Sequence, residues 1–337
     1  MRGNFQKVLF VVVLVVAALL VGRNSIGNSG VLEINGDDRA NIVSVVTGRE
    51  IINVNGEGGS SLLDSNAGES FGEGEDYIYR GTLVGDTGFR RVANEPVYEK
   101  NFSASAVVDL ESETFYFEHN KNKQWPLASI TKLMTAVIVE DNFAREKTIT
   151  LSNEDFDKFG DWIGVLEAGE SYSVDDLIWA ALLSSSNEAV NALARTYGWD
   201  SFIEKMNSKA TEWGLSNTHF SDPAGLSVSS QSTVFDIVIL VGRIYNDYPD
   251  ILERTRRQGW TIKELESGKF KKIYSNNEFA GHYNFLGGKT GYTDEAVGNL
   301  ISLFSYKERP VVVVIFGSSD RFGVTESLYS WFRFNFE

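Results

Sequence analysis

The sequence predicts an α+β fold, in which an antiparallel β-sheet is flanked by terminal helices and carries an inserted all-helical lobe. Strand-like apolar runs lie near residue 104 and beyond residue 255, whereas helical patterns fill the chain between them. Because strands and helices are segregated along the chain, we expect helices on the faces of an antiparallel sheet. A cleft between the sheet and the helical lobe is then the natural place for a functional site.

The first strands and the first helix are expected from residue 104 onward. Residues 104–110 and 114–118 alternate or run apolar around a Glu-Ser-Glu turn, which indicates a β-hairpin. Residues 133–139 are apolar nearly all round, so the helix that contains them is predicted to be buried. Ser129 and Lys132 lie at its N-terminal end, where free backbone N–H groups can face a developing oxyanion.

The middle of the chain is predicted to be helical. Ser173-Val174-Asp175-Asp176 is a helix-start signal. Residues 184–187 interrupt the helix that follows, which places Ser185 and Asn187 in a turn between two helices. Two further helices are expected, over residues 200–213 and 233–245.

The last third of the chain changes to strand character. Apolar runs predict strands over residues 260–263, 285–291, 298–304 and 311–316. An amphipathic segment over 324–334 predicts a closing helix. This order of elements supports a sheet built from both ends of the domain.

Composition excludes several classes of protein. The formal net charge of −15 argues against a nucleic-acid partner, because such a surface needs basic patches. The chain has no cysteine, which excludes disulfides, thiolate metal sites and a catalytic cysteine. Its 3 histidines are far apart in the sequence and lack the spacing of a zinc site. We therefore expect no metal and no cofactor.

The N-terminal segment, residues 1–23, has the pattern of an export signal. Residues 8–21 are continuously apolar between basic residues, and as a helix they span about 21 Å. This fits a cleaved secretory signal, with Ser25-Ile26-Gly27 as a cleavage site, or an uncleaved membrane anchor, which we favour. Both place the rest of the chain on the extracytoplasmic face of the cell membrane, anchored there, or secreted if the signal is cleaved.

A linker is predicted over residues 24–95, ahead of a catalytic domain over 96–337. The linker is rich in glycine, serine, asparagine and acidic residues, which is typical of a flexible, charged segment. Short apolar runs over 41–46, 51–54 and 77–84 are candidates for local strands within it.

Three short motifs, far apart and in a fixed order, carry the chemistry. They are Ser129-Ile130-Thr131-Lys132, Ser185-Ser186-Asn187 and Lys289-Thr290-Gly291. A serine and a lysine three residues apart on a helix share a face, so the amine can reach the hydroxyl and act as its base. The second motif supplies another hydroxyl and an amide, and the third a cation beside a glycine that leaves room for substrate.

From about residue 100 to the C-terminus the chain resembles the serine D-alanyl-D-alanine carboxypeptidases, the low-molecular-mass penicillin-binding proteins. The three motifs together are the signature of these proteins and of class A β-lactamases. The surrounding segments are similar as well, over residues 126–136, 169–177, 288–293 and 331–334. The resemblance implies a β-lactamase/DD-peptidase-like fold, a peptidoglycan stem peptide ending in D-Ala-D-Ala as substrate, and β-lactam antibiotics as covalent inhibitors.

The resemblance also implies a role for each site residue. Ser129 would be the nucleophile and Lys132 its general base, with Ser185 relaying a proton to the leaving amine and Asn187 holding the peptide and Lys132. The third motif would bind the terminal carboxylate, and backbone N–H groups of Ser129 and Tyr292 would form the oxyanion hole. The substrate-binding set implied is Lys289, Thr290, Gly291, Tyr292 and Arg321.

The chain departs from the family pattern in the segment where relatives often have His-Gly-Leu, which here is Ala224-Gly225-Leu226. The middle residue of the second motif is Ser186 instead of glycine. Two alternatives to a carboxypeptidase stay open. One is a β-lactamase of the same fold, for which Glu204 is the candidate deacylating residue although it lies in an expected helix. The other is a non-catalytic scaffold that binds peptidoglycan.

Overall fold

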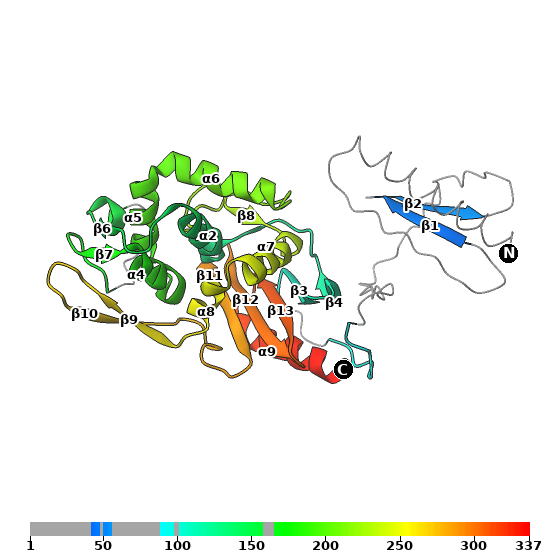
Figure 1. Cartoon of the computed structure of the whole chain (residues 1–337). Helices are drawn as coiled ribbons and strands as arrows, with labels where there is room; N and C mark the ends of the chain where they lie inside the picture. Colours follow the sequence, from blue (N-terminus) through cyan, green and yellow to red (C-terminus); the bar gives the residue numbers. More distant parts are fainter. Residues whose placement is uncertain (1–41, 48–49, 56–87, 98–100, 158–164) are drawn as a thin grey trace, which may run out of the picture. The chain divides into compact units, whose positions relative to one another are not determined.

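The computed structural model describes residues 42–47, 50–55, 88–97, 101–157 and 165–337 (Figure 1). The chain divides into two compact units, residues 1–74 and 75–337. In the first unit, strands β1 (Ile42–Thr47) and β2 (Glu50–Asn55) form an antiparallel hairpin, close to two of the three local strands expected there. The third run, 77–84, and the apolar segment 8–21 lie outside the described residues. No helix among the residues that are described is long and apolar enough to cross a membrane.

The second unit is built on an antiparallel sheet that, in the described part of the chain, has five strands in the order β11-β12-β13-β3-β4. The first hairpin supplies β3 and β4, and the strand-rich last third supplies the others, as expected. The bounds of the strands are β3 Ala104–Asp109, β4 Thr114–His119, β11 Phe285–Thr293, β12 Val297–Tyr306 and β13 Arg309–Phe316.

Both faces of the sheet are covered, which explains why β13 is apolar without alternation. Val311, Val313 and Ile315 pack on the face covered by helix α9 (Arg321–Asn335). The alternate residues of β13, beginning with Val312, pack on the opposite face against the helical lobe. Figure 1 shows α9 on one side of the sheet and helix α7 (Val234–Asp247) on the other.

Of the described residues, only α9 is a terminal helix that flanks the sheet. The segment ahead of β3, residues 88–97, is instead an extended strap that pairs with the end of α9. Arg90 and Glu337 exchange backbone hydrogen bonds of 2.7 and 2.9 Å, and the Val92 N–H donates to the carbonyl of Asn335 at 2.7 Å. The Phe89 ring packs edge-on against Phe332, with 5.2 Å between ring centroids.

The helical lobe follows the expected order, including the interruption between two helices at Ser185. Two pairs of short strands border it, β5 (Trp125–Pro126) with β8 (Gln231–Ser232) and β6 (Thr148–Thr150) with β7 (Ser171–Ser173). Its helical segments are the 3-10 turn η2 Ala128–Thr131, α2 Lys132–Asn142, α3 Glu154–Asp157, α4 Val174–Trp179, the π-helical turn η3 Ala180–Ser184, α5 Asn187–Tyr197, α6 Trp199–Glu212, α7 and α8 Pro249–Thr255.

The strand expected over 260–263 is present but does not join the main sheet. It is β9 (Gly259–Lys263), and it pairs only with β10 (Phe270–Tyr274) among the described residues. The sequence analysis did not predict β10. Its outward-facing residues are Phe270, Lys272 and Tyr274, so the strand lacks a simple alternation of apolar and polar residues. The resulting hairpin packs on η3 and α4.

Candidate active site

The first motif lies where β11 crosses the start of the long buried helix. Ser129 belongs to η2, and α2 begins at Lys132, so the serine stands one short turn ahead of the α-helix in which it was expected. Ala128, just before it, has a left-handed backbone with φ of 49°. Such conformations are uncommon for residues with a Cβ and concentrate at functional sites. The turn leaves the Ser129 side chain partly exposed and Lys132 fully buried.

The Lys132 amine is fixed by three acceptors. Its Nζ donates to Ser129 Oγ at 2.9 Å, to Asn187 Oδ1 at 2.8 Å and to the Ala224 carbonyl at 2.9 Å. These three contacts use all three hydrogens of the ammonium. The neutral amine has two hydrogens, which can go to Asn187 and Ala224, so that its lone pair points at the Ser129 hydroxyl.

Burial lowers the pKa of Lys132 from 10.5 to about 7, because the charged form loses its hydration. Two buried carboxylates, those of Asp222 and Glu188, oppose this shift by favouring the ammonium. A base whose pKa lies near neutral pH is present in its neutral form and still takes up a proton readily. The amine therefore has the properties needed to deprotonate Ser129.

Asp222 organises the loop that carries the Ala224 carbonyl. Its carboxylate accepts hydrogen bonds from the backbone N–H groups of four consecutive residues, 224–227, at 2.6–3.1 Å, and from Ser230 Oγ at 3.1 Å. Only 4% of Asp222 is exposed. A carboxylate with this many donors is held rigidly, so the loop presents its carbonyl to Lys132 in one position.

The second motif forms the turn between η3 and α5. A π-helical turn ends at Ser184, and Ser185 then adopts a left-handed backbone with φ of 62°. Ser186 caps α5, accepting from the Ala189 N–H at 3.1 Å, and its hydroxyl donates to the buried Glu188 Oε2 at 2.7 Å. The middle residue of the motif thus fixes the turn on which Ser185 and Asn187 stand.

The third motif lies on β11 and faces the second. Lys289 is 1% exposed, and its Nζ donates to Ser185 Oγ at 2.9 Å and to the Thr290 carbonyl at 3.1 Å. Burial lowers the pKa of Lys289 well below its usual value, and the charges of Lys132 and Arg321 lower it further. Thr290 Oγ1 donates to Asn276 Oδ1 at 2.8 Å. Two buried amines thus lie behind two partly exposed serine hydroxyls.

The sequence analysis expected Gly291 to leave room for substrate, but the structure gives this glycine a different role. A Cβ at this position would lie 2.9 Å from the carbonyl oxygen of Leu127 and 3.2 Å from the Cβ of Ala128. The space is filled by the turn that carries Ser129. The glycine therefore allows β11 to approach that turn closely, which is what brings Lys289 to the serines.

Gly225 approaches the same turn even more closely. A Cβ there would lie 1.8 Å from the Ala128 carbonyl oxygen, and its φ of +81° also favours glycine. In the segment Ala224-Gly225-Leu226, the departure from the family pattern affects the side chain at 224, while the backbone carbonyl at 224 contacts Lys132. Gly225 itself is required by the close approach to Ala128 and by its positive φ.

Tyr292 and Arg321 lie at the edge of the site. Tyr292 is 62% exposed and pairs with Gly298 across the β11–β12 ladder. Arg321, at the start of α9, donates from Nη1 to the Gly291 carbonyl at 3.2 Å. The guanidinium is half-buried and adds positive charge beside Lys289.

Three residues that support the site were missed or set aside in the sequence. Asp222, Glu188 and Asn276 were not among the predicted site residues. The first two were detectable as acids in segments that must be buried beside the motifs, since a buried carboxylate needs a specific reason. Nothing local to Asn276 marks it. Among the residues described, no group of three histidine or acidic side chains could hold a metal ion.

A family model described as D-alanyl-D-alanine carboxypeptidase matches residues 92–320, which contain all three motifs. The chain belongs to this family of serine peptidases. A D-alanyl-D-alanine endopeptidase of Escherichia coli is 30% identical over 258 residues, which are 74% of this chain and 82% of that protein.

Solved structures of the family share the fold of the second unit. A D-alanyl-D-alanine carboxypeptidase of Mycobacterium tuberculosis superposes with a TM-score of 0.64 at 25% identity, covering 72% of this chain and 94% of that one. Penicillin-binding protein D2 of Listeria monocytogenes, in its cefotaxime-bound form, gives a TM-score of 0.62 at 28% identity, covering 70% of this chain and 98% of that one. The predicted α+β, DD-peptidase-like fold is confirmed.

Proposed function

We propose that the cleft hydrolyses the terminal peptide bond of peptidoglycan stem peptides ending in D-Ala-D-Ala, through an acyl-enzyme on Ser129. The observation that carries this proposal is the 2.9 Å contact between Lys132 Nζ and Ser129 Oγ, made by an amine whose pKa is lowered to about 7. Membership of the D-alanyl-D-alanine carboxypeptidase family supports the substrate class.

Acylation starts with transfer of the Ser129 hydroxyl proton to Lys132 Nζ as Oγ attacks the carbonyl carbon of the penultimate D-alanine. The carbonyl oxygen becomes an oxyanion beside backbone N–H groups at Ser129 and Tyr292. The C–N bond then breaks, and the departing amine receives the proton held by Lys132, passed on through Ser185, which leaves Lys132 neutral. In deacylation, water gives a proton to Lys132 and attacks the ester carbon. The bond from this carbon to Ser129 Oγ then breaks, and Lys132 returns the proton to Oγ.

The substrate carboxylate completes the electrostatics of the site. Lys132 and Lys289 are both buried, and the charge of Lys132 lowers the pKa of Lys289. A carboxylate bound beside Lys289 favours the ammonium there. The ammonium and the carboxylate act on Lys132 with opposite signs. Lys289 therefore serves to recognise the carboxylate, and Lys132 keeps the role of base.

The test is the lifetime of a penicillin adduct on the full chain, followed by intact mass, together with release of D-alanine from a soluble pentapeptide. We expect a long-lived adduct and D-alanine release, both lost in Ser129→Ala. An adduct hydrolysed within seconds would indicate a β-lactamase. No adduct and no release would leave a non-catalytic scaffold.

The structure of the helical lobe bears on the β-lactamase alternative. Glu204, the candidate deacylating residue, lies within α6 and is exposed to solvent. A glutamate that activates the deacylating water must face the acyl-enzyme. The carboxypeptidase is the better supported function.

Cleavage of cross-links by the same cleft is a second candidate activity, because the 30%-identical relative from Escherichia coli is named an endopeptidase. Digestion of cross-linked dimers, followed by mass spectrometry, separates the two activities. Loss of a single D-alanine marks the carboxypeptidase, and conversion of dimers to monomers marks the endopeptidase.

We also propose that residues 1–23 anchor the chain in the membrane and place residues 96–337 on its extracytoplasmic face. The support is the apolar run over 8–21 between basic flanks. Fractionation of cells that make the full chain, with protease added outside, tests this. Recovery in the medium at a lower mass would indicate a cleaved signal.

A further inference from the structure

The outer face of the β9–β10 hairpin is an exposed aromatic and basic surface. Residues directly opposite in the two strands share a face, and the pairs Lys263–Phe270, Thr261–Lys272 and Gly259–Tyr274 alternate with the inward pairs. Phe270 is 70% exposed and Tyr274 is 65% exposed. We call this set, residues 259, 261, 263, 270, 272 and 274, the hairpin face.

The other side of the hairpin holds it firmly on the helical lobe. Ile262 and Ile273 are buried there. Trp260 stacks on Trp179 of α4 with 4.1 Å between ring centroids and 7° between their planes. The Lys271 amine donates to the Val165 carbonyl at 2.7 Å. A hairpin anchored in this way presents its outer face as a rigid surface.

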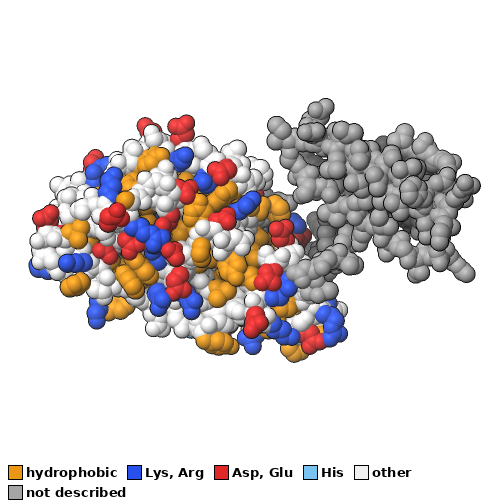
Figure 2. All heavy atoms as spheres, viewed as in Figure 1, with side chains coloured by type: hydrophobic (Ala, Val, Ile, Leu, Met, Phe, Trp, Pro, Cys, Tyr) orange, Lys and Arg blue, Asp and Glu red, His pale blue; other side chains and the backbone are white. Residues whose placement is uncertain are grey.

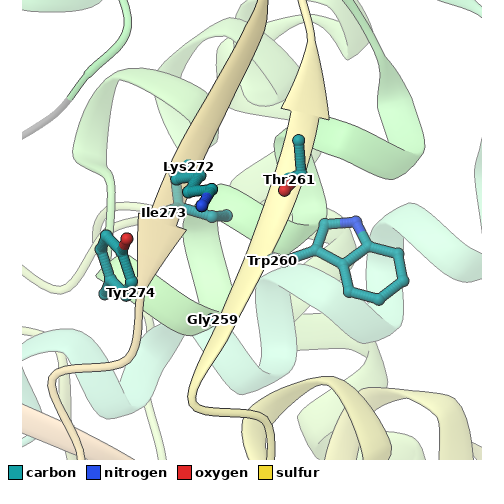
Figure 3. Close-up of a pocket in the computed structure, with 6 residues that line it drawn as sticks. All are labelled: Gly259, Trp260, Thr261, Lys272, Ile273 and Tyr274. Atoms are coloured by element: carbon teal, nitrogen blue, oxygen red, sulfur yellow. The ribbon is translucent and has the colours of Figure 1, made fainter.

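A pocket of about 350 Å³ opens at the base of the hairpin (Figure 3). Its lining residues are Gly259, Trp260, Thr261, Lys272, Ile273 and Tyr274. Figure 3 shows Trp260 and Thr261 on β9 beside Lys272 and Tyr274 on β10. Aromatic surface beside a hydroxyl and an amine offers apolar contact and hydrogen bonds together, and the volume is within the range of ligand sites.

The charge of the hairpin is opposite to that of the chain. Residues 259–274 contain four lysines and two glutamates, whereas the chain carries a net charge of −15. One of these glutamates, Glu264, is buried and accepts the Ser171 and Glu266 N–H groups, so it does not face the partner. In Figure 2, basic and hydrophobic side chains are interspersed at the end of the molecule where Figure 1 places the hairpin. The face therefore suits an uncharged or anionic partner.

The hairpin continues directly into the active site. Two residues after Tyr274, Asn276 accepts the hydrogen bond of Thr290 in the third motif, and its N–H donates to the Leu183 carbonyl at 3.3 Å. The hairpin also packs on η3, the turn that ends just before Ser185. A polymer whose side branch occupies the cleft must extend beyond it. The hairpin is joined to the cleft through Asn276 and through η3, so its outer face is a candidate surface for such a polymer.

We propose that the hairpin face binds the glycan strand of peptidoglycan while a stem peptide of that strand occupies the cleft. The proposal rests on the proposed function. N-acetylated sugar rings have apolar C–H faces that pack on aromatic rings and polar edges that hydrogen-bond to side chains such as Thr261 and Lys272. A strand of five residues is about 17 Å long, so the face accommodates more than one sugar.

The test compares a polymer with a peptide that lacks sugars. The full chain carrying Phe270→Ser and Tyr274→Ser is assayed for D-alanine release from purified insoluble peptidoglycan and from a soluble pentapeptide. We expect activity on peptidoglycan to fall about tenfold, and activity on the pentapeptide to stay within about twofold of wild type. A matched control, Tyr283→Ser with Phe334→Ser, removes exposed aromatic rings from other elements and should change neither activity.

Three results would overturn the proposal. Equal activity of variant and wild type on peptidoglycan would show that the face does not bind the polymer. An equal loss on both substrates would show that the substitutions disturb the cleft. Reduced sedimentation with vesicles of anionic phospholipid, with peptidoglycan binding unchanged, would assign the face to a lipid surface. If wild type released no D-alanine from the pentapeptide, the proposed function itself would fail, which is a separate outcome.

Discussion

Asp222 and Lys132 are connected through a single residue, Ala224. The carboxylate of Asp222 accepts the Ala224 N–H at 2.8 Å, and the Lys132 amine donates to the Ala224 carbonyl at 2.9 Å. Asp222 thus acts on the base in two ways, through the position of this carbonyl and through its negative charge, which raises the pKa of Lys132. The predictions below separate these effects.

Acylation should follow the protonation of Lys132. Its pKa is lowered to about 7, and only the neutral amine can accept the Ser129 proton. We therefore expect the second-order rate of acylation by penicillin to rise with pH through about 7 and then level off. The measurement is the acylation rate from about pH 5 to about pH 9. A rate that stays flat across neutral pH would contradict Lys132 as the base.

Removing the Glu188 charge should shift this profile without disturbing the site. Glu188→Gln keeps an oxygen to accept the Ser186 hydroxyl and loses the negative charge that favours the Lys132 ammonium. The pKa of Lys132 then falls, and the rising limb of the acylation rate moves to lower pH. The plateau rate should stay within about twofold, since the turn is retained. A shift of the rising limb to higher pH would contradict the assignment that Glu188 raises the pKa of Lys132.

Asp222→Asn should shift the limb in the same direction and also lower the plateau. The amide presents N–H groups to a ring of backbone donors that needs an acceptor, so the loop and the Ala224 carbonyl move. We expect a loss of about tenfold to a hundredfold in the plateau rate, as for a misplaced catalytic group. Ser230→Ala removes one donor to the carboxylate and is the mild control. If Asp222→Asn matched Glu188→Gln, the carboxylate would act by charge alone.

Lys289 should matter most for substrates with a free carboxylate. Lys289→Gln is compared on two pentapeptides that differ only in a terminal carboxylate or carboxamide. With either peptide the variant lacks the Lys289 amine that donates to Ser185. Only the carboxylate peptide also loses a buried positive charge as its partner. We expect kcat/KM to fall about 10²-fold or more for the carboxylate and about tenfold for the amide. Equal losses would leave Lys289 with a role toward Ser185 alone.

The sequence predicted most elements of this fold because their signals are local. The S-x-x-K turn, the cap at Ser173 and the strands of the sheet each depend on neighbouring residues, and the structure has them at the expected places. The partners of the hydrogen bonds in the site could not be predicted in the same way. Asn276 meets Thr290, and Ala224 meets Lys132, only through the tertiary fold.

The role of Gly291 was predicted wrongly for the same reason, because it depends on contacts made by the tertiary fold. A glycine beside a catalytic lysine is compatible with space for a ligand or with a close approach of backbone, and the motif does not distinguish these. The position of Leu127 decides between them. Residues 88–95 of the strap were likewise assigned to the linker, whose composition is rich in glycine, serine, asparagine and acidic residues. Its pairing partner, the end of α9, is more than 230 residues away in the sequence.

Gly225→Ala should abolish acylation by displacing the turn of Ser129. The new Cβ would lie 1.8 Å from the Ala128 carbonyl oxygen, in addition to the strain of a φ of +81°. Gly214→Ala is the matched control, because its φ is +76° and no atom lies within 4 Å of the new Cβ. The control should lose about 1 kcal/mol of stability and keep its acylation rate. Equal acylation by both variants would show that the turn tolerates the displacement.

The strap should contribute to the stability of the domain although it lies far from the motifs. A chain that begins at residue 88 is compared with one that begins at residue 96, so that the two differ only in the strap. The longer chain keeps the paired backbone of Arg90 and Val92 and the ring contact of Phe89 with Phe332. These interactions are worth about 2 to 4 kcal/mol together, which corresponds to a fall in Tm of about 5 to 15 °C when they are removed.

Phe89→Ala in the full chain should give part of that fall, since it removes the ring and leaves the backbone pairing. Acylation by penicillin below the transition should be unchanged in all of them, because the strap pairs with the end of α9, which carries none of the three motifs. Equal Tm values for the two truncated chains would show that the pairing at the end of α9 adds nothing to the fold.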